Sequence, residues 1–275
     1  MITRNICRSI LILFLTLAMI LPVQAGANRI ISLVPSQTEL LFELGFGDQI
    51  VGVSDFCNFP PATGKIEKIG GLELSIEKLV ALQPTLLVDA NSMHKKYEPL
   101  FQQLGLNYAN FSTTRLEHLP VVACELAKLL KDPGKGILFS EAWNSRLRKL
   151  DLKKPEKGLL VYFEIWDTPM QAAGQSSFIG ELISRSGGIN ICKDQTDFPL
   201  VNSESVINAN PDVIFVAYPL PNLKNIKNRA GWASLKAVKN NLVFSLDQDL
   251  FVRPGPRNLE ALELLNEIFH QVQTP

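Results

Sequence analysis

The sequence has no surplus of either charge and few cysteines. Its 275 residues carry 27 Lys+Arg against 27 Asp+Glu, so there is no basic surplus of the kind that attracts nucleic acid. Four cysteines are too few for a disulfide-dense scaffold, and a hydrophobic content of 46% is too high for a disordered chain. The composition indicates a globular protein without a nucleic-acid partner.

Signatures of catalysis and metal binding are also missing. No G-x-S-x-G, P-loop, G-x-G-x-x-G or H-E-x-x-H motif occurs, so neither a nucleophile elbow nor a phosphate-binding loop is indicated. The histidines His94, His118 and His270 lie in dissimilar segments, and His94 precedes two lysines in what reads as a polar loop. We expect no catalytic residue, no metal site and no cofactor, with an exported hydrolase as a distant alternative.

The first 25 residues have the features of a cleavable secretion signal. Arg4 and Arg8 precede an apolar run over residues 10–21, and Val23-Gln24-Ala25 suits a signal-peptidase site. The run is shorter than the roughly 20 residues that span a bilayer. Cys7 lies before the run rather than at the cleavage point, so no lipid anchor is indicated. We expect cleavage near Ala25 and a soluble exported protein with 25 basic and 27 acidic groups.

Three cysteines, Cys57, Cys124 and Cys192, remain in the exported chain. Exported proteins fold where disulfides form, but an odd number of cysteines cannot all pair within one chain. A Cys57–Cys192 disulfide stays open as an alternative to free thiols.

Strand-like and helix-like segments alternate along the chain. Residues 29–34 form an apolar run typical of a buried strand, and Ser36 and Glu39 then have the spacing of a capping box at a helix start. Gly45 is placed to end this helix, and residues 50–54 read as the next strand. This alternation predicts an α/β fold with parallel-type sheets.

An internal repeat predicts two lobes of related design. Residues 76–88 and 203–215 each read as a short helix, a proline that ends it and a buried strand. Glu77 and Glu204 occupy the same place in the two copies, 127 residues apart.

The repeat divides the chain into a signal peptide at 1–25, an N-terminal α/β lobe at 26–132, a linking helix at 133–154 and a C-terminal α/β lobe at 155–275. A helical connector is stiffer than a loop. We therefore expect little movement of one lobe relative to the other.

A binding site is expected where the carboxyl ends of the strands meet, because open parallel sheets form a crevice there. If the lobes face each other, aromatic side chains supply apolar walls while polar ones orient the ligand; ordinary packing is the alternative for each aromatic. The candidate ligand-binding residues are Ser36, Phe56, Asn58, Leu72, Asn91, Trp166, Phe198, Asp249, Phe251 and Arg253.

Five ordered segments carry a resemblance to a known family. They are Arg29–Leu40, Val51–Pro61, Ser75–Pro84, the second copy around Glu204, and Arg253-Pro-Gly-Pro-Arg257. Together they resemble periplasmic substrate-binding proteins for cobalamin and iron siderophores, closest to the cobalamin branch, over nearly all of residues 28–272. The resemblance implies two Rossmann-like lobes joined by one long rigid helix, with a metal chelate bound between them.

The resemblance also implies a partner and a place. Such proteins work as monomers in the periplasm and deliver their ligand to a dimeric ABC permease in the inner membrane. One glutamate on each lobe meets basic residues of one permease subunit, and Glu77 and Glu204 match those positions. The alternative is that both glutamates simply favour the helix dipole.

The ligand is less sharply defined than the family. Cobalamin binders that resemble this chain hold the corrin with tyrosine and tryptophan, whereas the matching positions here carry Phe56, Leu72, Ala90 and Phe198. We expect a corrinoid. The alternatives are a corrinoid without the lower base, a ferric siderophore and haem. Arg253 would pair with a phosphate or carboxylate of any of these.

Overall fold

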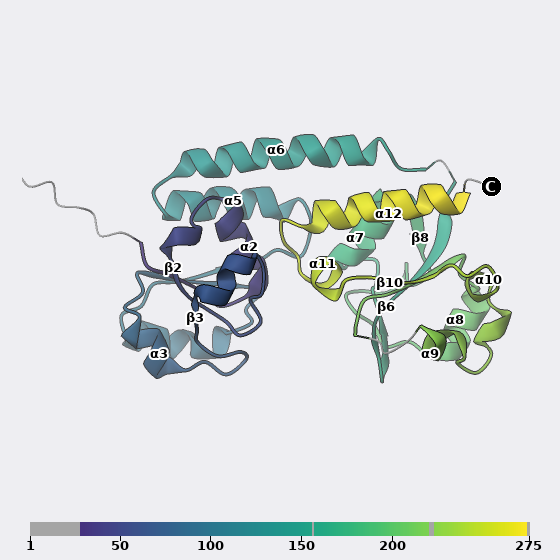
Figure 1. Cartoon of the computed structure of the whole chain (residues 1–275), viewed down its shortest axis with the longest axis horizontal. Coiled ribbons are helices and arrows are strands. Elements are labelled where there is room, and N and C mark those ends of the chain that lie inside the picture. The colour runs from purple at the N-terminus through teal and green to yellow at the C-terminus, as the bar shows by residue number, and fades with distance from the viewer. Residues whose placement is uncertain (1–27, 156, 220–222, 274–275) are drawn as a thin grey trace, which may run out of the picture.

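The computed structural model describes residues 28–155, 157–219 and 223–273, and it has two α/β lobes side by side (Figure 1). One long helix runs along both lobes. The signal peptide predicted for residues 1–25 lies outside the described residues.

The N-terminal lobe is built on a parallel sheet with the strand order β3-β2-β1-β4-β5. β1 and β4 are buried along their whole length, as expected for apolar strands in the middle of a parallel sheet. The elements are β1 (Ile30–Ser32), α2 (Pro35–Glu43), β2 (Ile50–Val53), β3 (Glu67–Lys68), α3 (Ile76–Ala81), β4 (Leu86–Ala90), α4 (Glu98–Gln103), β5 (Tyr108–Phe111) and α5 (His118–Leu129), with short 3-10 helices at Gly47–Gln49, Pro61–Lys65 and Lys95–Tyr97.

The C-terminal lobe has a sheet with the order β10-β9-β6-β7, and β8 also pairs with β6. All of these pairs are parallel except β6 with β7. The elements are β6 (Leu159–Asp167), β7 (Met170–Ala172), α7 (Phe178–Arg185), β8 (Gly188–Asn190), α8 (Ser203–Ala209), β9 (Val213–Val216), α9 (Lys224–Lys227), a 3-10 helix at Trp232–Ser234, α10 (Lys236–Lys239), β10 (Val243–Ser245), α11 (Gln248–Val252) and α12 (Asn258–Gln273). The predicted α/β class with parallel-type sheets is confirmed.

The two copies of the repeat fold alike. In each, a short helix (α3 or α8) leads through a proline to a buried strand (β4 or β9), and that strand pairs in parallel with the first strand of its lobe. Gln83 and Asn210, the matching residues before the prolines, both adopt positive φ, +46° and +45°. The left-handed residue stops the helix and turns the chain toward the strand.

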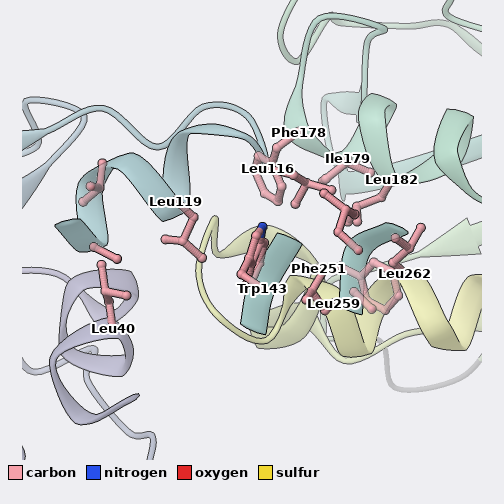
Figure 2. Close-up of a cluster of buried hydrophobic side chains, with 14 of the residues drawn as sticks. Leu40, Leu116, Leu119, Trp143, Phe178, Ile179, Leu182, Phe251, Leu259 and Leu262 are labelled. Atoms are coloured by element: carbon pink, nitrogen blue, oxygen red, sulfur yellow. The ribbon is translucent and has the colours of Figure 1, made fainter. Parts of the chain in front are cut away.

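The lobes are joined by α6 (Pro133–Asp151), which begins where the sequence predicts and ends three residues earlier than residue 154. Buried apolar residues form a core that is continuous from one lobe to the other through Trp143 of α6, as Figure 2 shows for Leu40, Leu119, Phe178 and Leu259. The lobes are therefore held together by packing as well as by the helix. The division of the chain at residues 132 and 155 stays a prediction.

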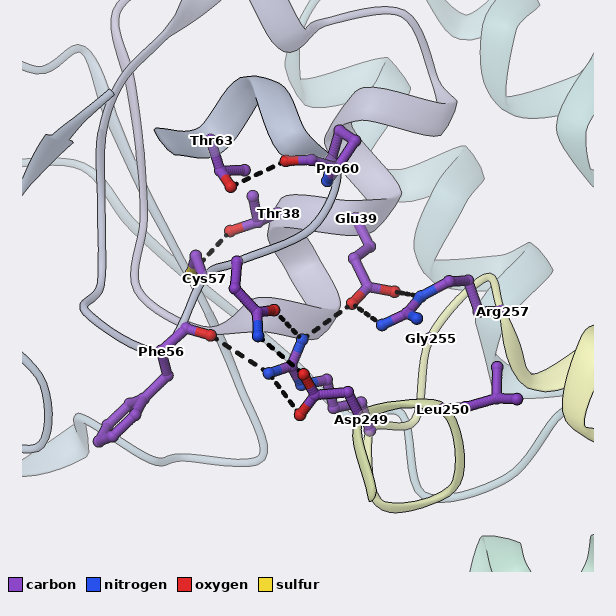
Figure 3. A network of polar contacts seen from close by, with 12 residues as sticks. Thr38, Glu39, Phe56, Cys57, Pro60, Thr63, Asp249, Leu250, Gly255 and Arg257 are labelled. Atoms are coloured by element: carbon purple, nitrogen blue, oxygen red, sulfur yellow. Dashed lines mark hydrogen bonds and ion pairs between the residues drawn. The ribbon is translucent and has the colours of Figure 1, made fainter. Parts of the chain in front are cut away.

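The start of α2 differs from the predicted capping box. The N-cap is Val34 and no side chain caps the helix, so Ser36 lies inside the first turn. Glu39 instead receives two hydrogen bonds from the guanidinium of Arg257, at 2.9 and 2.8 Å, across 218 residues of sequence (Figure 3). The prediction fails because a distant charged partner competes better for this carboxylate than a local backbone amide. The predicted stop is confirmed: Gly45 has φ +71°.

The open alternative of a Cys57–Cys192 disulfide is wrong. Both thiols are free and buried, and they belong to separate apolar clusters in different lobes. Cys57 Sγ lies 3.1 Å from the hydroxyl oxygens of both Thr38 and Ser54. Burial raises the pKa of the Cys192 thiol to about 11, which makes it unreactive at neutral pH.

Candidate ligand-binding site

A pocket lies at the carboxyl ends of β1 and β4 and draws its lining from both lobes. It encloses about 170 Å³, less than a typical small-molecule site. The N-terminal lobe supplies Leu33, Val34, Pro35, Ser36, Phe56, Leu72, Ala90, Asn91, Met93 and His94, and the C-terminal lobe supplies Val252, Arg253 and Pro254. Five of the predicted ligand-binding residues therefore line one pocket: Ser36, Phe56, Leu72, Asn91 and Arg253.

Three large apolar side chains of this pocket are open to solvent. Phe56 is 51% exposed, Leu72 58% and Met93 54%. Apolar groups that are exposed together in a concave surface mark a binding site, unlike single exposed residues. Sequence reasoning predicted the first two and missed Met93.

Arg253 is already held by acceptors of the protein. Its guanidinium lies 2.7 Å from Asp249 and 3.3 Å from Glu39, and it donates to Asn58 Oδ1 at 2.7 Å and to the Phe56 carbonyl at 3.3 Å. Asn58 in turn donates to Asp249 at 2.8 Å. Figure 3 shows Glu39, Phe56 and Asp249 converging on this network. A ligand anion therefore has to share Arg253 with acceptors that already hold it.

His94 is buried at the pocket and joins two of its lining segments. Its Nδ1 lies 3.2 Å from Asp89 Oδ1, and its Nε2 lies 3.0 Å from the carbonyl oxygen of Gly71, next to Leu72. Burial opposes the imidazolium charge, but these two acceptors outweigh it and raise the pKa of His94. Tyr108 also donates to Asp89, at 2.8 Å.

The prediction of His94 in a polar loop is wrong for its side chain, which is 1% exposed. The sequence did hold a signal for this contact. Asp89 is an acid inside the otherwise apolar strand β4, and a buried carboxylate needs a partner.

The turn after β4 is strained and firmly held. Asn91 and Ser92 adopt φ of +51° and +59°, which is uncommon for residues other than glycine. Asn91 Oδ1 accepts from the Thr113 amide at 3.0 Å, and the Ser92 amide donates to Asn110 Oδ1 at 2.9 Å. Strain of this kind persists where the surroundings enforce it, often at functional sites. Here it places Asn91 and the following Met93 at the pocket.

A second exposed apolar surface lies at the carboxyl end of β6. Trp166 is 51% exposed, its Nε1 donates to the Thr168 carbonyl at 3.1 Å, and its ring lies 6.2 Å from that of Tyr218. Gln171 pairs with both Trp166 and Leu200, and Leu200 is 67% exposed. Trp166 is thus exposed but does not line the pocket described above, so its predicted contact with ligand stays a prediction.

The remaining two predicted aromatics lie elsewhere. Phe251 is fully buried in the core shared by the lobes, with its ring 5.6 Å from Phe163 (Figure 2). Its prediction as a ligand-binding residue is wrong, because α11 turns this side chain inward. Phe198 is half-buried and packs edge-on against Phe178 at 6.4 Å, so a contact with ligand stays a prediction.

The two repeat glutamates occupy equivalent places on one side of the molecule. Glu77 lies in the first turn of α3 and Glu204 in the first turn of α8, and both are exposed. The two helices lie on the side away from α6, one in each lobe (Figure 1). Among the described residues, neither glutamate forms an ion pair.

Residues 28–155, 157–219 and 223–273 contain neither a helix suited to span a membrane nor a cluster suited to bind a metal ion. No helix there is both long and apolar enough to cross a membrane. In the same part of the chain, no cluster of three or more His, Cys, Asp or Glu side chains is arranged to hold a metal ion.

Comparison with known proteins gives the family. Residues 30–250 match the family model described as periplasmic binding protein. The chain belongs to this family. It is 30% identical over 243 residues to the vitamin B12-binding protein of Vibrio cholerae, covering 86% of this chain and 87% of the relative. It is 29% identical over 258 residues to an uncharacterized ABC transporter substrate-binding lipoprotein of Bacillus subtilis, covering 87% of this chain and 79% of the relative.

Solved structures of the family agree with the two-lobed fold. The periplasmic vitamin B12-binding protein of Vibrio cholerae superposes with a TM-score of 0.77 at 28% identity, covering 90% of this chain and 99% of that chain. A periplasmic haem-binding protein of Roseiflexus sp. RS-1 superposes with a TM-score of 0.83 at 24% identity, covering 90% and 99%. The predicted resemblance is thus confirmed at the level of the family and fold.

Proposed function

We propose that this chain is a periplasmic receptor that captures a corrinoid between its lobes and delivers it to an ABC permease of the inner membrane. The pocket lined by both lobes supports this most directly, since its exposed Phe56, Leu72 and Met93 suit a large ligand with apolar faces. The exposed Trp166 extends the apolar surface beyond the pocket. The relatives named for vitamin B12 favour a corrinoid over other chelates.

Haem is the second candidate, and one observation favours it. Met93 presents a half-exposed thioether at the pocket, and methionine sulfur is a ligand that haem iron accepts. His94 is not available for such a contact, because both of its ring nitrogens already face acceptors.

The proposed receptor binds its ligand without changing it. Ser36 supplies the pocket's hydroxyl, and among the described residues it makes no hydrogen bond to His94 that would activate it. The alternative of an exported hydrolase is therefore not supported by an activated nucleophile in the pocket.

Glu77 and Glu204 are proposed to dock the receptor on its permease. Two equivalent exposed carboxylates, one in each lobe, suit a partner with two-fold symmetry, so one monomeric receptor can engage a permease dimer. Export to the periplasm is proposed from the signal-like residues 1–25.

Isothermal titration of residues 26–275 with cyanocobalamin, cobinamide and haemin tests the ligand. We expect binding of at least one corrinoid, and we expect Phe56→Ala to weaken it about tenfold or more, because roughly 1.5–3 kcal/mol of apolar burial is lost. Leu138→Ala is the matched control, since Leu138 is 68% exposed but lies on α6, away from the pocket. If only haemin gave a binding heat, haem would replace the corrinoid as the proposed ligand. If none of the three compounds gave a binding heat, the proposal would be refuted.

A further inference from the structure

Glu164 is the centre of a buried polar cluster in the C-terminal lobe. Its carboxylate is fully buried and accepts hydrogen bonds from the hydroxyls of Tyr162 (2.8 Å) and Tyr218 and from both terminal nitrogens of Arg229 (2.6 and 2.8 Å). Four donors satisfy the four lone-pair directions of a carboxylate, so each member is held in one geometry. Sequence reasoning missed this cluster, whose members are spread over 68 residues.

On one side the cluster supports the exposed Trp166. The Tyr218 ring, held by Glu164 and by Arg229 Nη2 at 3.3 Å, packs on the Trp166 ring at 6.2 Å with an interplanar angle of 52°. A displacement of Trp166 by a ligand therefore pushes directly on a side chain of the cluster.

On the other side the cluster reaches the helix that carries Glu204. The guanidinium of Arg229 lies 4.7 Å above the ring of Trp232, which is fully buried. Trp232 Nε1 donates to the hydroxyl of Ser203 at 2.5 Å, and Ser203 is the first residue of α8, next to Glu204.

We propose that Glu164 and Arg229 are positioning residues that couple the placement of Trp166, on the apolar surface beyond the pocket, to the orientation of α8, so that a ligand reaching Trp166 is reported at Glu204. The physical reason is that the middle of the path, through Tyr218, Glu164 and Trp232, is buried, and close-packed interiors transmit displacement instead of absorbing it. The purpose of the coupling rests on the proposed delivery function, whereas the coupling itself does not.

The repeat provides an internal comparison for this proposal. The residue that matches Ser203 in the N-terminal copy is Ile76, whose side chain can neither donate nor accept a hydrogen bond. The coupling is therefore confined to the C-terminal lobe, and α3 should not respond to changes in the cluster.

Hydrogen exchange of the ligand-free protein, residues 26–275, tests the coupling without reference to any ligand. Trp166→Phe reduces the exposed ring that packs on Tyr218, and Tyr218→Phe and Arg229→Lys weaken the cluster. We expect Trp166→Phe to change exchange of the α8 amides about 2- to 30-fold, the range of measured couplings, and to leave α3 unchanged. In the Arg229→Lys background this effect should disappear, because lysine cannot bond the carboxylate in two places.

Arg146→Lys is the matched control, because Arg146 forms an exposed pair with Glu263 at 2.9 Å outside the cluster. An α8 exchange rate that Trp166→Phe leaves unchanged would overturn the proposal. An effect of the same size with and without Arg229 would overturn it as well. Near-ultraviolet circular dichroism shows whether each variant folds. If Arg229→Lys does not fold, Tyr218→Phe, which removes only one hydroxyl of the cluster, replaces it.

A second measurement adds saturating cyanocobalamin. We expect the ligand to slow α8 exchange in the wild type, and to bind Arg229→Lys without slowing it, an outcome that a merely structural role of Arg229 does not produce. If the wild type bound none of cyanocobalamin, cobinamide and haemin, the proposed function would be wrong. Hydrogen exchange of the ligand-free protein would still show whether Trp166 and α8 are coupled.

Discussion

Both ring nitrogens of His94 face oxygen acceptors, and this makes the side chain a pH-sensitive support for one wall of the pocket. As an imidazolium it can donate to Asp89 and to the Gly71 carbonyl at once. A neutral ring has one N–H, so one of the two contacts is lost. The Gly71 contact is the weaker of the two because its acceptor is uncharged, and Leu72 of the pocket wall follows it directly.

We expect the stability that His94 provides to fall as the pH rises. Its pKa in the folded protein is raised above the unfolded value of about 6.5, so its contribution is complete below about pH 6.5 and is lost as the pH rises through the folded-state pKa. Urea unfolding of wild type and His94→Gln should differ by about 1.5–3 kcal/mol at acidic pH and by less at alkaline pH.

His118→Gln is the control for this prediction. His118 lies in the exposed contact with Thr114, at 3.5 Å, and its removal should not produce the same pH dependence. A difference between wild type and His94→Gln that is constant with pH would contradict the imidazolium assignment.

At the scale of elements, the unit of helix, proline and strand occurs twice with the same geometry. Each copy has its glutamate in the first turn of a helix, where a carboxylate favours the dipole, and each helix ends at a left-handed residue before the proline. Dipole placement alone leaves open why both carboxylates are exposed and without an ion pair among the described residues. In the proposed docking, a two-fold permease surface with basic groups would supply these partners.

Charge reversal of both glutamates should impair uptake and spare ligand binding. We expect Glu77→Lys with Glu204→Lys to lower uptake of labelled cyanocobalamin in the native host about tenfold or more, because electrostatic attraction to the permease becomes repulsion. Titration should give an affinity for cyanocobalamin near that of the wild type.

A second double variant, Glu141→Lys with Glu267→Lys, changes net charge equally on α6 and α12. Both of its sites are exposed and lie on the side away from α3 and α8. Its uptake should match the wild type. If the docking variant also transported normally, the assignment of Glu77 and Glu204 would be wrong.

At the scale of the whole molecule, the lobes are joined by three kinds of contact. The α6 helix connects them covalently, and one apolar core passes through Trp143 from one lobe to the other. The third kind is polar and includes the buried pair of Glu39 with Arg257, in which the hydrogen bond to Glu39 raises the pKa of Arg257 against the effect of burial. Closing or opening the lobes would disturb all three, so the lobes should move little and unfold together.

Glu39→Gln should therefore destabilise both lobes at once. It leaves Arg257, whose side chain is 14% exposed, without its paired carboxylate, and such a loss costs about 3–5 kcal/mol. Arg253 keeps its pair with Asp249. Guanidinium unfolding should show one transition with a lowered midpoint. The control Glu263→Gln removes the exposed pair with Arg146 and should cost less than about 1 kcal/mol. Two separate transitions, or a loss below about 1 kcal/mol for Glu39→Gln, would show that the lobes are not coupled in this way.

Features that depend on neighbours along the chain could be predicted from the sequence. The order of strands and helices, the stop at Gly45 and the duplicated unit around Glu77 and Glu204 follow from periodicity, turn residues and spacing, which act over a few residues at a time. The pocket residues Phe56 and Leu72 follow from the rule that parallel strands present their carboxyl ends at one edge.

Features that depend on contacts between residues far apart in the sequence could be found only from the folded structure. Glu39 has the spacing of a helix cap, but the stronger charge-assisted bonds come from Arg257, far along the chain. Cys57 and Cys192 have compatible chemistry but belong to separate apolar clusters. Phe251 and Trp166 are alike as apolar aromatics in the sequence, yet packing buries the first completely and leaves half of the second exposed, because burial is set by the surface that tertiary contacts bring against a side chain.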